Sequence, residues 1–445
     1  MDSSLKSIDP DAPGHGVREQ QGDTSPPSSV NRAVIAGAIG NFVECFDWFA
    51  YALFASYLSR LVFPSGDPLG ALLSTFAVFA IGFFVRPLGS FIFGIYADRY
   101  GRKNALAATI FLMATGSLMI AIVPSFQQAG WLAPAMLLLA RLMQGLAMGG
   151  ETSSGGSYIV ESAPLHRRGF SGSFFYISVG LGTLCASLTG TFLTYLLPKD
   201  QMESYGWRLV FVLGALLGIF GLYLRRSIGE SEVFKRAART TSKKDRGSLR
   251  AVMLNHWPGV LRVFFLAIGT TMAFYIWAAY IPNLLRASGR VSASTSFLAS
   301  TFGLIAYSAS MPISGALADR VGRRLVLGSS WLLFAALFIP MIHYALGNPE
   351  SLPWIMVVAM SLIGLGSGAV AASFAEQFPT SVRAIGWGVP YNVSIAVFGG
   401  TAPYLGSWLA SKGMPDLFNW YVVALCVISG LAAFGLRDLR GRPLD

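Results

Sequence analysis

The sequence predicts an all-α membrane protein with twelve transmembrane helices arranged as two pseudo-symmetric six-helix bundles. Of its 445 residues, 53% are hydrophobic and only 12% are charged, whereas about a quarter of the residues in a soluble domain are charged. The apolar residues form long runs, and these runs recur along the whole chain. Two polar motifs of the first half also return in the second half, which indicates a duplicated architecture.

Six apolar segments separated by short polar links occupy the first half of the chain. Each is long enough to cross a hydrocarbon core of about 30 Å at about 1.5 Å per residue. We expect these helices at residues 32–59, 69–96, 104–123, 132–160, 170–197 and 207–225. The predicted N-terminal bundle is therefore 31–226, preceded by a Ser- and Pro-rich tail, 1–30, whose composition is typical of disorder.

The second half repeats this pattern after a polar cytoplasmic linker predicted at 227–257. Six further helices are expected at residues 260–286, 293–317, 325–346, 353–376, 384–411 and 417–436. They form a predicted C-terminal bundle, 258–437, followed by a short tail, 438–445. An even number of helices places both termini on the same side of the membrane.

Lysine and arginine concentrate in alternate links, and this distribution predicts the orientation. The densest group lies between Arg225 and Arg262, on the side that also holds both termini. Because basic links stay in the cytoplasm, we expect a multi-pass protein of a bacterial inner membrane with both termini cytoplasmic. The net charge of +11 is explained by these links, so we expect the lipid bilayer and no nucleic acid as a partner.

The repeated motifs lie at the predicted cytoplasmic ends of helices. The turn containing Asp98, Arg99 and Arg102 recurs around Asp319, Arg320 and Arg323, and Glu161 with Arg168 recurs as Glu376 with Arg383. An aspartate in such a turn is able to pair with an arginine or with the N-terminus of a facing helix. These motif residues, apart from Arg168, are candidate gating residues; the alternative is that their basic members only set the orientation.

Carboxylates inside predicted membrane helices are candidate proton carriers. Asn41, Glu44 and Asp47 follow a three-residue spacing on the first helix, which we expect to place them along one face, and Glu151 lies on the fourth. Burial favours the protonated form of such a group, whereas a neighbouring arginine favours the carboxylate. We assign proton coupling to Glu44, Asp47 and Glu151, with a structural ion pair as the alternative.

Arg141 is the first candidate for contact with an anionic substrate. A guanidinium donates two parallel hydrogen bonds to a carboxylate, and Gln144 lies one helical turn away. The alternative is a salt bridge between Arg141 and Glu44 or Asp47. Arg141 is able to alternate between this salt bridge and the substrate contact during transport.

Other polar groups complete the predicted site. Asn41 joins Arg141 and Gln144 as a substrate-binding candidate in the first half, and Tyr275, Tyr391 and Asn392 are the candidates in the second, with helix packing as the alternative. Arg86 precedes Pro87 near the predicted cytoplasmic half of the second helix. Two roles are therefore expected for Arg86: a gating or structural role, and contact with the substrate.

Known signatures of enzymes are missing from the sequence. It contains no P-loop, no zinc motif and no Ser/His/Asp arrangement, and the three cysteines lie inside apolar stretches. We therefore expect no enzymatic activity, no cofactor and no metal site. We also expect a monomer.

Several of these motifs resemble the major facilitator superfamily and, within it, the metabolite:proton symporter family. The matching elements are Gly40 to Asp47, Arg86 to Gly89, the paired Asp-Arg-x-Gly-Arg turns, Arg141 to Glu151, Gly206 to Arg208 and Phe398 to Gly400. Loop and helix-end segments further resemble the α-ketoglutarate permeases of this family. Two departures concern the site: Cys45 stands where the family commonly has Trp, and Thr-Ser-Ser-Gly-Gly follows Glu151 where the permeases have a different segment.

This resemblance implies the major facilitator fold and secondary active transport by alternating access. The implied activity is proton-coupled symport of a small organic acid, α-ketoglutarate or a similar dicarboxylate, so the expected partners are that acid and protons. Residues 169–197 contain no proline, unlike the helix-five motif of many antiporters, and this favours symport over drug efflux. The alternatives are proton-coupled transport of another solute, such as shikimate, citrate, proline or betaine, an efflux antiporter on the same fold, or a membrane sensor.

Overall fold

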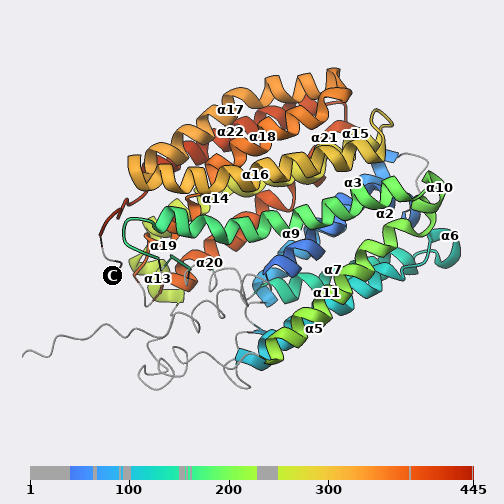
Figure 1. Cartoon of the computed structure of the whole chain (residues 1–445), viewed down its shortest axis with the longest axis horizontal. Helices are drawn as coiled ribbons and strands as arrows, with labels where there is room; N and C mark the ends of the chain where they lie inside the picture. The colour runs from blue at the N-terminus through green and yellow to red at the C-terminus, as the bar shows by residue number, and fades with distance from the viewer. Residues whose placement is uncertain are drawn as a thin grey trace, which may run out of the picture.

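The computed structural model describes residues 41–63, 68–89, 92–93, 102–149, 156, 159–160, 163–227, 249–379, 382–442 and 444. Within these ranges the chain is helical and contains no strand, and the long helices run along one common direction (Figure 1). The all-α fold class predicted from the sequence is confirmed. Eight of the described helices are long and apolar enough to cross a membrane.

Helices of the first half follow the predicted spans closely. Residues 41–53 are helical, Phe54 forms a turn, and the helix resumes as α2. The remaining bounds are α2 (Ala55–Val62), α3 (Pro68–Phe84), α5 (Arg102–Ala121), α6 (Phe126–Ala129), α7 (Leu132–Met148), α9 (Arg168–Leu196), α10 (Lys199–Gln201), the π-helix η1 (Met202–Gly206) and α11 (Trp207–Ser227).

The second half adds helices that the sequence did not predict and interruptions within those that it did. Its elements are α13 (Leu249–Asn255), α14 (Trp257–Tyr275), η2 (Ile276–Tyr280), α15 (Ile281–Ala287), α16 (Ala293–Val321), α17 (Arg323–Gly347), η3 (Pro349–Ser351), α18 (Leu352–Ser367), α19 (Val370–Ala375), α20 (Arg383–Ser394), η4 (Ile395–Gly399), α21 (Ala402–Ser411) and α22 (Pro415–Phe434). Helix α13 lies inside the segment predicted as a polar linker.

Two π-helical segments interrupt predicted spans, and prolines explain both. Pro282 follows η2 and Pro403 follows η4, each by a few residues. A proline has no N–H to donate to the carbonyl four residues before it, so the preceding turn widens. Such π-helical turns are frequent at functional sites, and both of these adjoin the central cavity described below.

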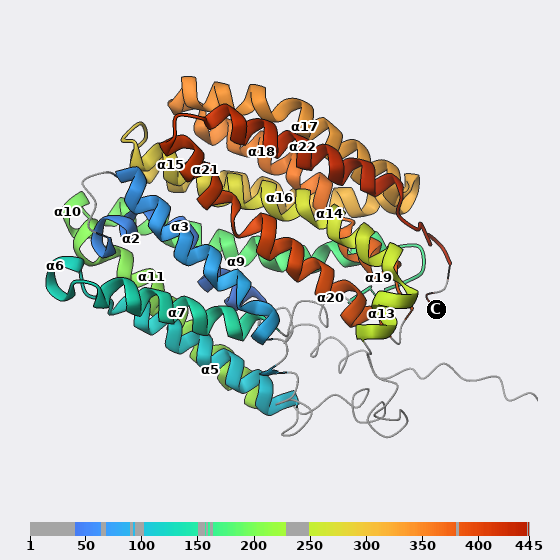
Figure 2. The same ribbon diagram turned by 180° about the vertical axis from the view of Figure 1, so that it is seen from behind.

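The two halves meet along two seams. Helix α9 of the first half packs along α16 of the second, and α3 packs against α21 and η4; the α9 and α16 ribbons lie side by side (Figures 1 and 2). At one crossing the backbones of Gly169 and Gly315 approach so closely that a Cβ on Gly315 would lie 2.5 Å from the Gly169 carbonyl oxygen. Glycines therefore allow the bundles to touch at this point.

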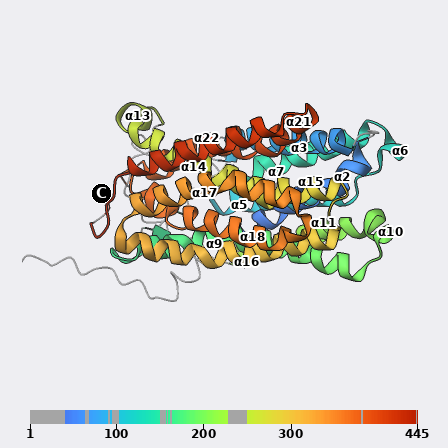
Figure 3. The same cartoon turned by 90° about the horizontal axis from the view of Figure 1, so that it is seen from above.

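Large apolar side chains cover the outside of the bundles, while the interface between the halves contains polar groups. Phe111 and Trp354, for example, are 64% and 76% exposed, as expected for helices whose outer faces meet lipid. The two ends of the molecule are easily told apart, because α6 and α10 lie at one end and α13 with the C-terminus at the other (Figure 3).

Candidate functional site: a central cavity between closed ends

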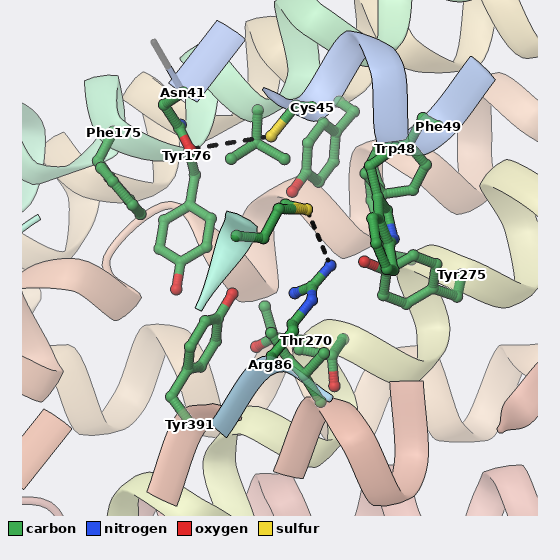
Figure 4. Close-up of a pocket in the computed structure, with 16 residues that line it drawn as sticks. Asn41, Cys45, Trp48, Phe49, Arg86, Phe175, Tyr176, Thr270, Tyr275 and Tyr391 are labelled. Carbon is green, nitrogen blue, oxygen red and sulfur yellow. Dashed lines mark hydrogen bonds between the residues drawn. The ribbon is translucent and has the colours of Figure 1, made fainter. Parts of the chain in front are cut away.

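A cavity lies between the two halves of the protein, lined by 16 residues (Figure 4). Its volume of ≈ 60 Å³ gives room for several water molecules, since one water needs about 10–15 Å³ by the same measure. The wall is rich in aromatic side chains from both halves, including Trp48, Phe49, Tyr176, Tyr275, Tyr307 and Tyr391. A concave space with a mostly apolar wall and few polar groups is the usual form of a small-molecule site.

Arg86 supplies the positive charge of this cavity. Helix α3 ends at Phe84, two residues before Arg86, and Pro87 prevents the regular hydrogen-bond ladder from continuing through this turn. The guanidinium carbon lies 4.2 Å from the centroids of both the Trp48 and the Phe83 rings, and Nη2 is 3.4 Å from the Met148 sulfur. Aromatic faces and a thioether thus hold the guanidinium at the cavity wall.

Arg141 lies in a different place, within a sealed chain of hydrogen bonds. Its Nη1 donates to Gln144 Oε1 at 2.7 Å, and Gln144 Nε2 donates to Asp47 Oδ2 at 2.5 Å and to Ser117 Oγ at 3.2 Å. Asp47 is 1% exposed, and Arg141 and Gln144 are fully buried. Arg141 and Gln144, predicted as substrate contacts, are therefore not part of the cavity wall in this conformation.

The connection between Arg141 and Asp47 corresponds to the pairing alternative weighed for this arginine, with Gln144 as a bridge. Among the described residues, Asp47 Oδ1 and the Nε and Nη2 atoms of Arg141 find no hydrogen-bond partner. Burying a carboxylate and a guanidinium whose hydrogen-bonding atoms are not all satisfied costs folding free energy. Such groups are typical of functional rather than structural pairs.

Trp48 connects the cavity to this sealed chain. Its ring centroid is 3.9 Å from the Arg141 guanidinium carbon and 4.2 Å from that of Arg86. The indole itself is fully buried. One aromatic ring therefore contacts both Arg86 and Arg141.

The remaining predicted site residues divide between the cavity and its surroundings. Asn41, Tyr275 and Tyr391 line the cavity, and Asn41 Nδ2 donates to Ser178 Oγ at 2.6 Å. Glu44 is buried outside the lining, near enough for its charge to act on Arg86. Asn392 is also buried outside the lining. Glu151 lies outside the described residues.

Several lining residues were missed by sequence reasoning. Tyr176, Tyr307 and the pair Thr270 and Thr271 face the cavity, but in the sequence they are ordinary members of apolar helices. Prolines in the sequence indicate the π-helical turns of the second half. Nearness to these turns is the one signal that could have pointed to Thr270 and Thr271.

At the end that holds α10, the second half clamps the first helix. The Asn283 amide is inserted at the Phe54 turn: its Nδ2 donates to the Ala52 carbonyl at 2.6 Å, and its Oδ1 accepts from the Ser56 N–H at 3.3 Å. These two backbone groups would pair with each other in an uninterrupted helix. Arg286 donates to the Leu53 carbonyl and to Asn283 Oδ1, both at 2.6 Å. This clamp was not predicted from the sequence.

At the opposite end, Asp319 caps a helix of the other half. Its carboxylate accepts hydrogen bonds from the backbone N–H groups of Gly169 and Phe170, each at 2.9 Å, in the first turn of α9. This is the contact with a facing helix N-terminus that the sequence allowed for. Negative charge is favoured there by the helix dipole.

Arg323 gathers the acidic groups behind this cap. Fully buried, it lies 2.8 Å from Glu376 and 3.5 Å from Asp319. Burial raises the pKa of Glu376 to about 7, and the charge of Arg323 opposes the rise. Charged groups of the second half therefore contact the first half at this end of the molecule.

The other predicted gating residues have separate places. Arg383 Nε donates to the carbonyls of Ala375 and Phe378, and the Arg320 carbonyl accepts from Arg440 Nη1 at 2.6 Å. Asp98, Arg99 and Glu161 lie outside the described residues. Arg102 begins α5, but its side chain is outside the described set.

Comparisons with known proteins identify the fold and the family. Residues 33–265 match the family described as "Sugar (and other) transporter", and residues 263–444 match the "Major Facilitator Superfamily". The structure is similar to that of the xylose transporter XylE from E. coli in a partially occluded inward-open conformation, with a TM-score of 0.75 and 17% identity over 94% of this chain and 100% of that one.

Curated relatives are transporters of small metabolites. The chain is 36% identical to the α-ketoglutarate permease of Escherichia coli K12, over 91% of this chain and 93% of the permease. It is 34% identical to a putative proline/betaine transporter of Staphylococcus aureus (90% and 86% covered) and 32% identical to the citrate-proton symporter of Klebsiella pneumoniae (90% of each). These relatives are membrane transporters rather than enzymes. Matched by family models across both halves and by such relatives along nine-tenths of its length, the chain belongs to the major facilitator superfamily of membrane transporters.

Proposed function

We propose that this transporter is a proton-coupled symporter that carries a small organic acid, α-ketoglutarate or a similar dicarboxylate, across a bacterial inner membrane by alternating access. The observation that carries this proposal is the Asp47–Gln144–Arg141 chain, sealed beside a cavity whose wall holds Arg86. A carboxylate that is shielded from water and linked to an arginine suits a reversible proton site. The 36% identity to an α-ketoglutarate permease supports the substrate class.

Charge balance gives the coupling a physical basis. When Asp47 is ionised, its charge offsets that of Arg141, which lies two hydrogen bonds away through Gln144. Protonation of Asp47 removes this offset and leaves the region around Arg141 and Arg86 more positive. In a medium of low dielectric constant such a change acts over several ångströms. An anion in the cavity is then favoured when the proton is bound, so the two travel together.

Contacts between the two halves lie at both ends of the molecule, where alternating access requires gates. The end with α13 and the C-terminus is assigned to the cytoplasm because the basic links predict this orientation. The Asp319 cap is then a cytoplasmic gate, and the Asn283 clamp a periplasmic one. Opening one end while the other stays closed exposes the cavity to one side at a time.

A zwitterion is the second candidate substrate. The cavity combines one arginine with many aromatic rings, and aromatic faces attract quaternary and secondary ammonium groups. The putative proline/betaine transporter among the relatives is consistent with this alternative. Competition by proline and betaine against the acid tells the two apart.

The test is uptake of labelled α-ketoglutarate, succinate or citrate into proteoliposomes with an imposed pH gradient, acidic outside. Wild-type protein is expected to accumulate one of them only with the gradient, and Asp47→Asn to lose accumulation while retaining exchange of internal for external substrate. Asp200→Asn changes an exposed carboxylate of α10 and serves as the matched control. Full gradient-driven accumulation by Asp47→Asn would refute the proton site, and export driven by the gradient would refute symport.

A further inference from the structure

We infer that Arg86, together with the hydroxyl groups of Tyr176, Tyr275 and Tyr391, forms the pole of the cavity that holds a carboxylate of the substrate. This inference rests on the proposed transport of an organic acid. It assigns the anion contact to Arg86, two residues after the end of α3, and leaves Arg141 to the sealed chain with Asp47. The ligand class is a compact acid engaged through one carboxylate.

Charge within the cavity supports this assignment. Among its described lining residues, Arg86 is the only charged side chain, and it is 4% exposed. Its guanidinium points into the middle of the cavity, toward the Met148 sulfur (Figure 4). A thioether is a weak acceptor, whereas a carboxylate accepts two charge-assisted hydrogen bonds from a guanidinium. An entering carboxylate therefore displaces a weak contact with a strong one.

Hydroxyl donors converge on the same place. The hydroxyl groups of Tyr176 and Tyr391 point toward each other, and that of Tyr275 lies beside the Arg86 guanidinium (Figure 4). Tyr176 is 3% exposed, and its Oη faces the Tyr391 hydroxyl but makes no hydrogen bond of regular geometry among the described residues. A buried hydroxyl with unused hydrogen-bonding capacity costs free energy unless a ligand satisfies it, so its position at the cavity supports a ligand there.

The pole is assembled from both halves of the transporter. Arg86 and Tyr176 belong to the first half, whereas Tyr275 and Tyr391 stand next to the π-helical turns η2 and η4 of the second. A carboxylate bound by all four bridges the halves and favours the conformation in which both ends are closed. Substrate binding then lowers the free energy of the occluded state, as a carrier requires.

The volume sets a limit on what fits beside the carboxylate. A cavity of ≈ 60 Å³ accepts a carboxylate and a short carbon chain only after small side-chain shifts. Thr270 and Thr271 also line the cavity, and their hydroxyls already donate to backbone carbonyls of their own helix and so remain acceptors.

Binding to purified full-length protein in detergent tests this pole without any gradient. The probes are α-ketoglutarate, glutarate and the uncharged dimethyl ester of α-ketoglutarate, measured by calorimetry. Tyr176→Phe removes one oxygen atom and is expected to bind the acids about tenfold more weakly, the equivalent of one lost charge-assisted hydrogen bond. Arg86→Gln is expected to lose more than about a hundredfold, with partial recovery in Arg86→Lys. Tyr223→Phe, at a 70% exposed position of α11, is the matched control.

The outcomes separate this inference from the proposed function. Size-exclusion profiles and thermal unfolding identify any variant that fails to fold, and Tyr176→Phe keeps the test valid if Arg86→Gln does so. Wild-type protein that binds an acid while Tyr176→Phe and Arg86→Lys bind it equally well overturns the pole but not the transport proposal. Tight binding of the dimethyl ester also overturns it. Wild-type protein that binds neither acid refutes both.

Discussion

Replacement of Asn283 by alanine tests whether the clamp at the Phe54 turn acts as a gate. The Asn283 side chain makes two hydrogen bonds across the interface, to the Ala52 carbonyl and from the Ser56 N–H. Alanine removes both, while Ala52 and Ser56 become free to pair within a continuous helix. The variant therefore weakens the contact between the halves without leaving these two backbone groups unsatisfied.

The expected size of the effect follows from the number of bonds lost. At a net value of about 1 kcal/mol for each hydrogen bond, the closed state of this end loses about 2 kcal/mol. This corresponds to an increase of about thirtyfold in the ratio of open to closed molecules. The contact of Arg286 with the Leu53 carbonyl remains, so the two halves are not expected to separate fully.

Cys45 provides a native reporter for this opening. It lines the cavity and is 4% exposed, so a thiol reagent reaches it only when an end opens. With Cys185 and Cys426 replaced by alanine, it is the single thiol of the chain. In intact cells, a membrane-impermeant maleimide is expected to label Cys45 about thirtyfold faster in Asn283→Ala. The proportionality holds while labelling is slower than closing.

The matched control is Asn348→Ala. Asn348 lies at the C-terminal end of α17, on the same side of the molecule, and among the described residues its side-chain amide bonds only to the Tyr344 carbonyl of its own helix. Its labelling rate is expected to equal that of the parent. A folded Asn283→Ala variant with an unchanged rate would show that the clamp does not hold this end closed.

Three further changes follow from the same contacts. Gln144→Leu breaks the bridge between Asp47 and Arg141 and is expected to lower the free energy of unfolding by about 3 kcal/mol, measured by denaturant titration; a loss below about 1 kcal/mol would contradict the bridge. Gly315→Ala places a Cβ 2.5 Å from the Gly169 carbonyl and is expected to slow transport at least tenfold, with Gly347→Ala, where a Cβ meets open space, as control. Glu376 has a pKa raised from 4.5 to about 7, so its contribution to stability is greatest below about pH 4.5 and is lost as the pH rises toward 7. Glu376→Gln is expected to flatten this part of the thermal unfolding profile, and an identical pH profile in both proteins would contradict the assignment.

The fold was predictable from the sequence because a bilayer leaves few choices. A chain that buries its backbone polar groups in hydrocarbon must form helices, so apolar runs locate α5, α17 and α22 to within a few residues. Helix α13 was missed because its short segment lies in a link rich in charged residues. The duplicated motifs predicted the two halves, and no side-chain geometry was needed for that step.

The site was predictable only in part, because the sequence does not fix the rotation of a helix against its neighbours. Residues three apart are rotated by about 60° from strict alignment on an α-helix. Asn41 and Asp47 therefore diverge by about 120°, so that Asn41 lines the cavity while Asp47 meets Gln144. The expectation of one common face was wrong for this reason, and Arg141, one turn from Gln144, follows Asp47 away from the cavity.

Contacts between segments that are distant in the chain could not be predicted from the sequence either. Asn283 and Ser56 are 227 positions apart, and the interaction uses a backbone group, which leaves no complementary pair of side chains to recognise. Residues that act by contact with a backbone of the opposite half require the packing of the two halves to be known.

Different chemical groups connect the two halves at the two ends of the transporter. This difference determines at which end protonation is able to change the contacts. The clamp uses an amide, an arginine and backbone groups, none of which titrates near neutral pH. The opposite end depends on carboxylates, Asp319 and Glu376. External acid therefore has no titratable group to protonate in the clamp itself. On the proposed orientation, a proton from outside must reach Asp47, beyond the clamp, before it influences the conformation. Coupling then requires the clamp to open first, so Asn283→Ala should ease proton entry and substrate entry together.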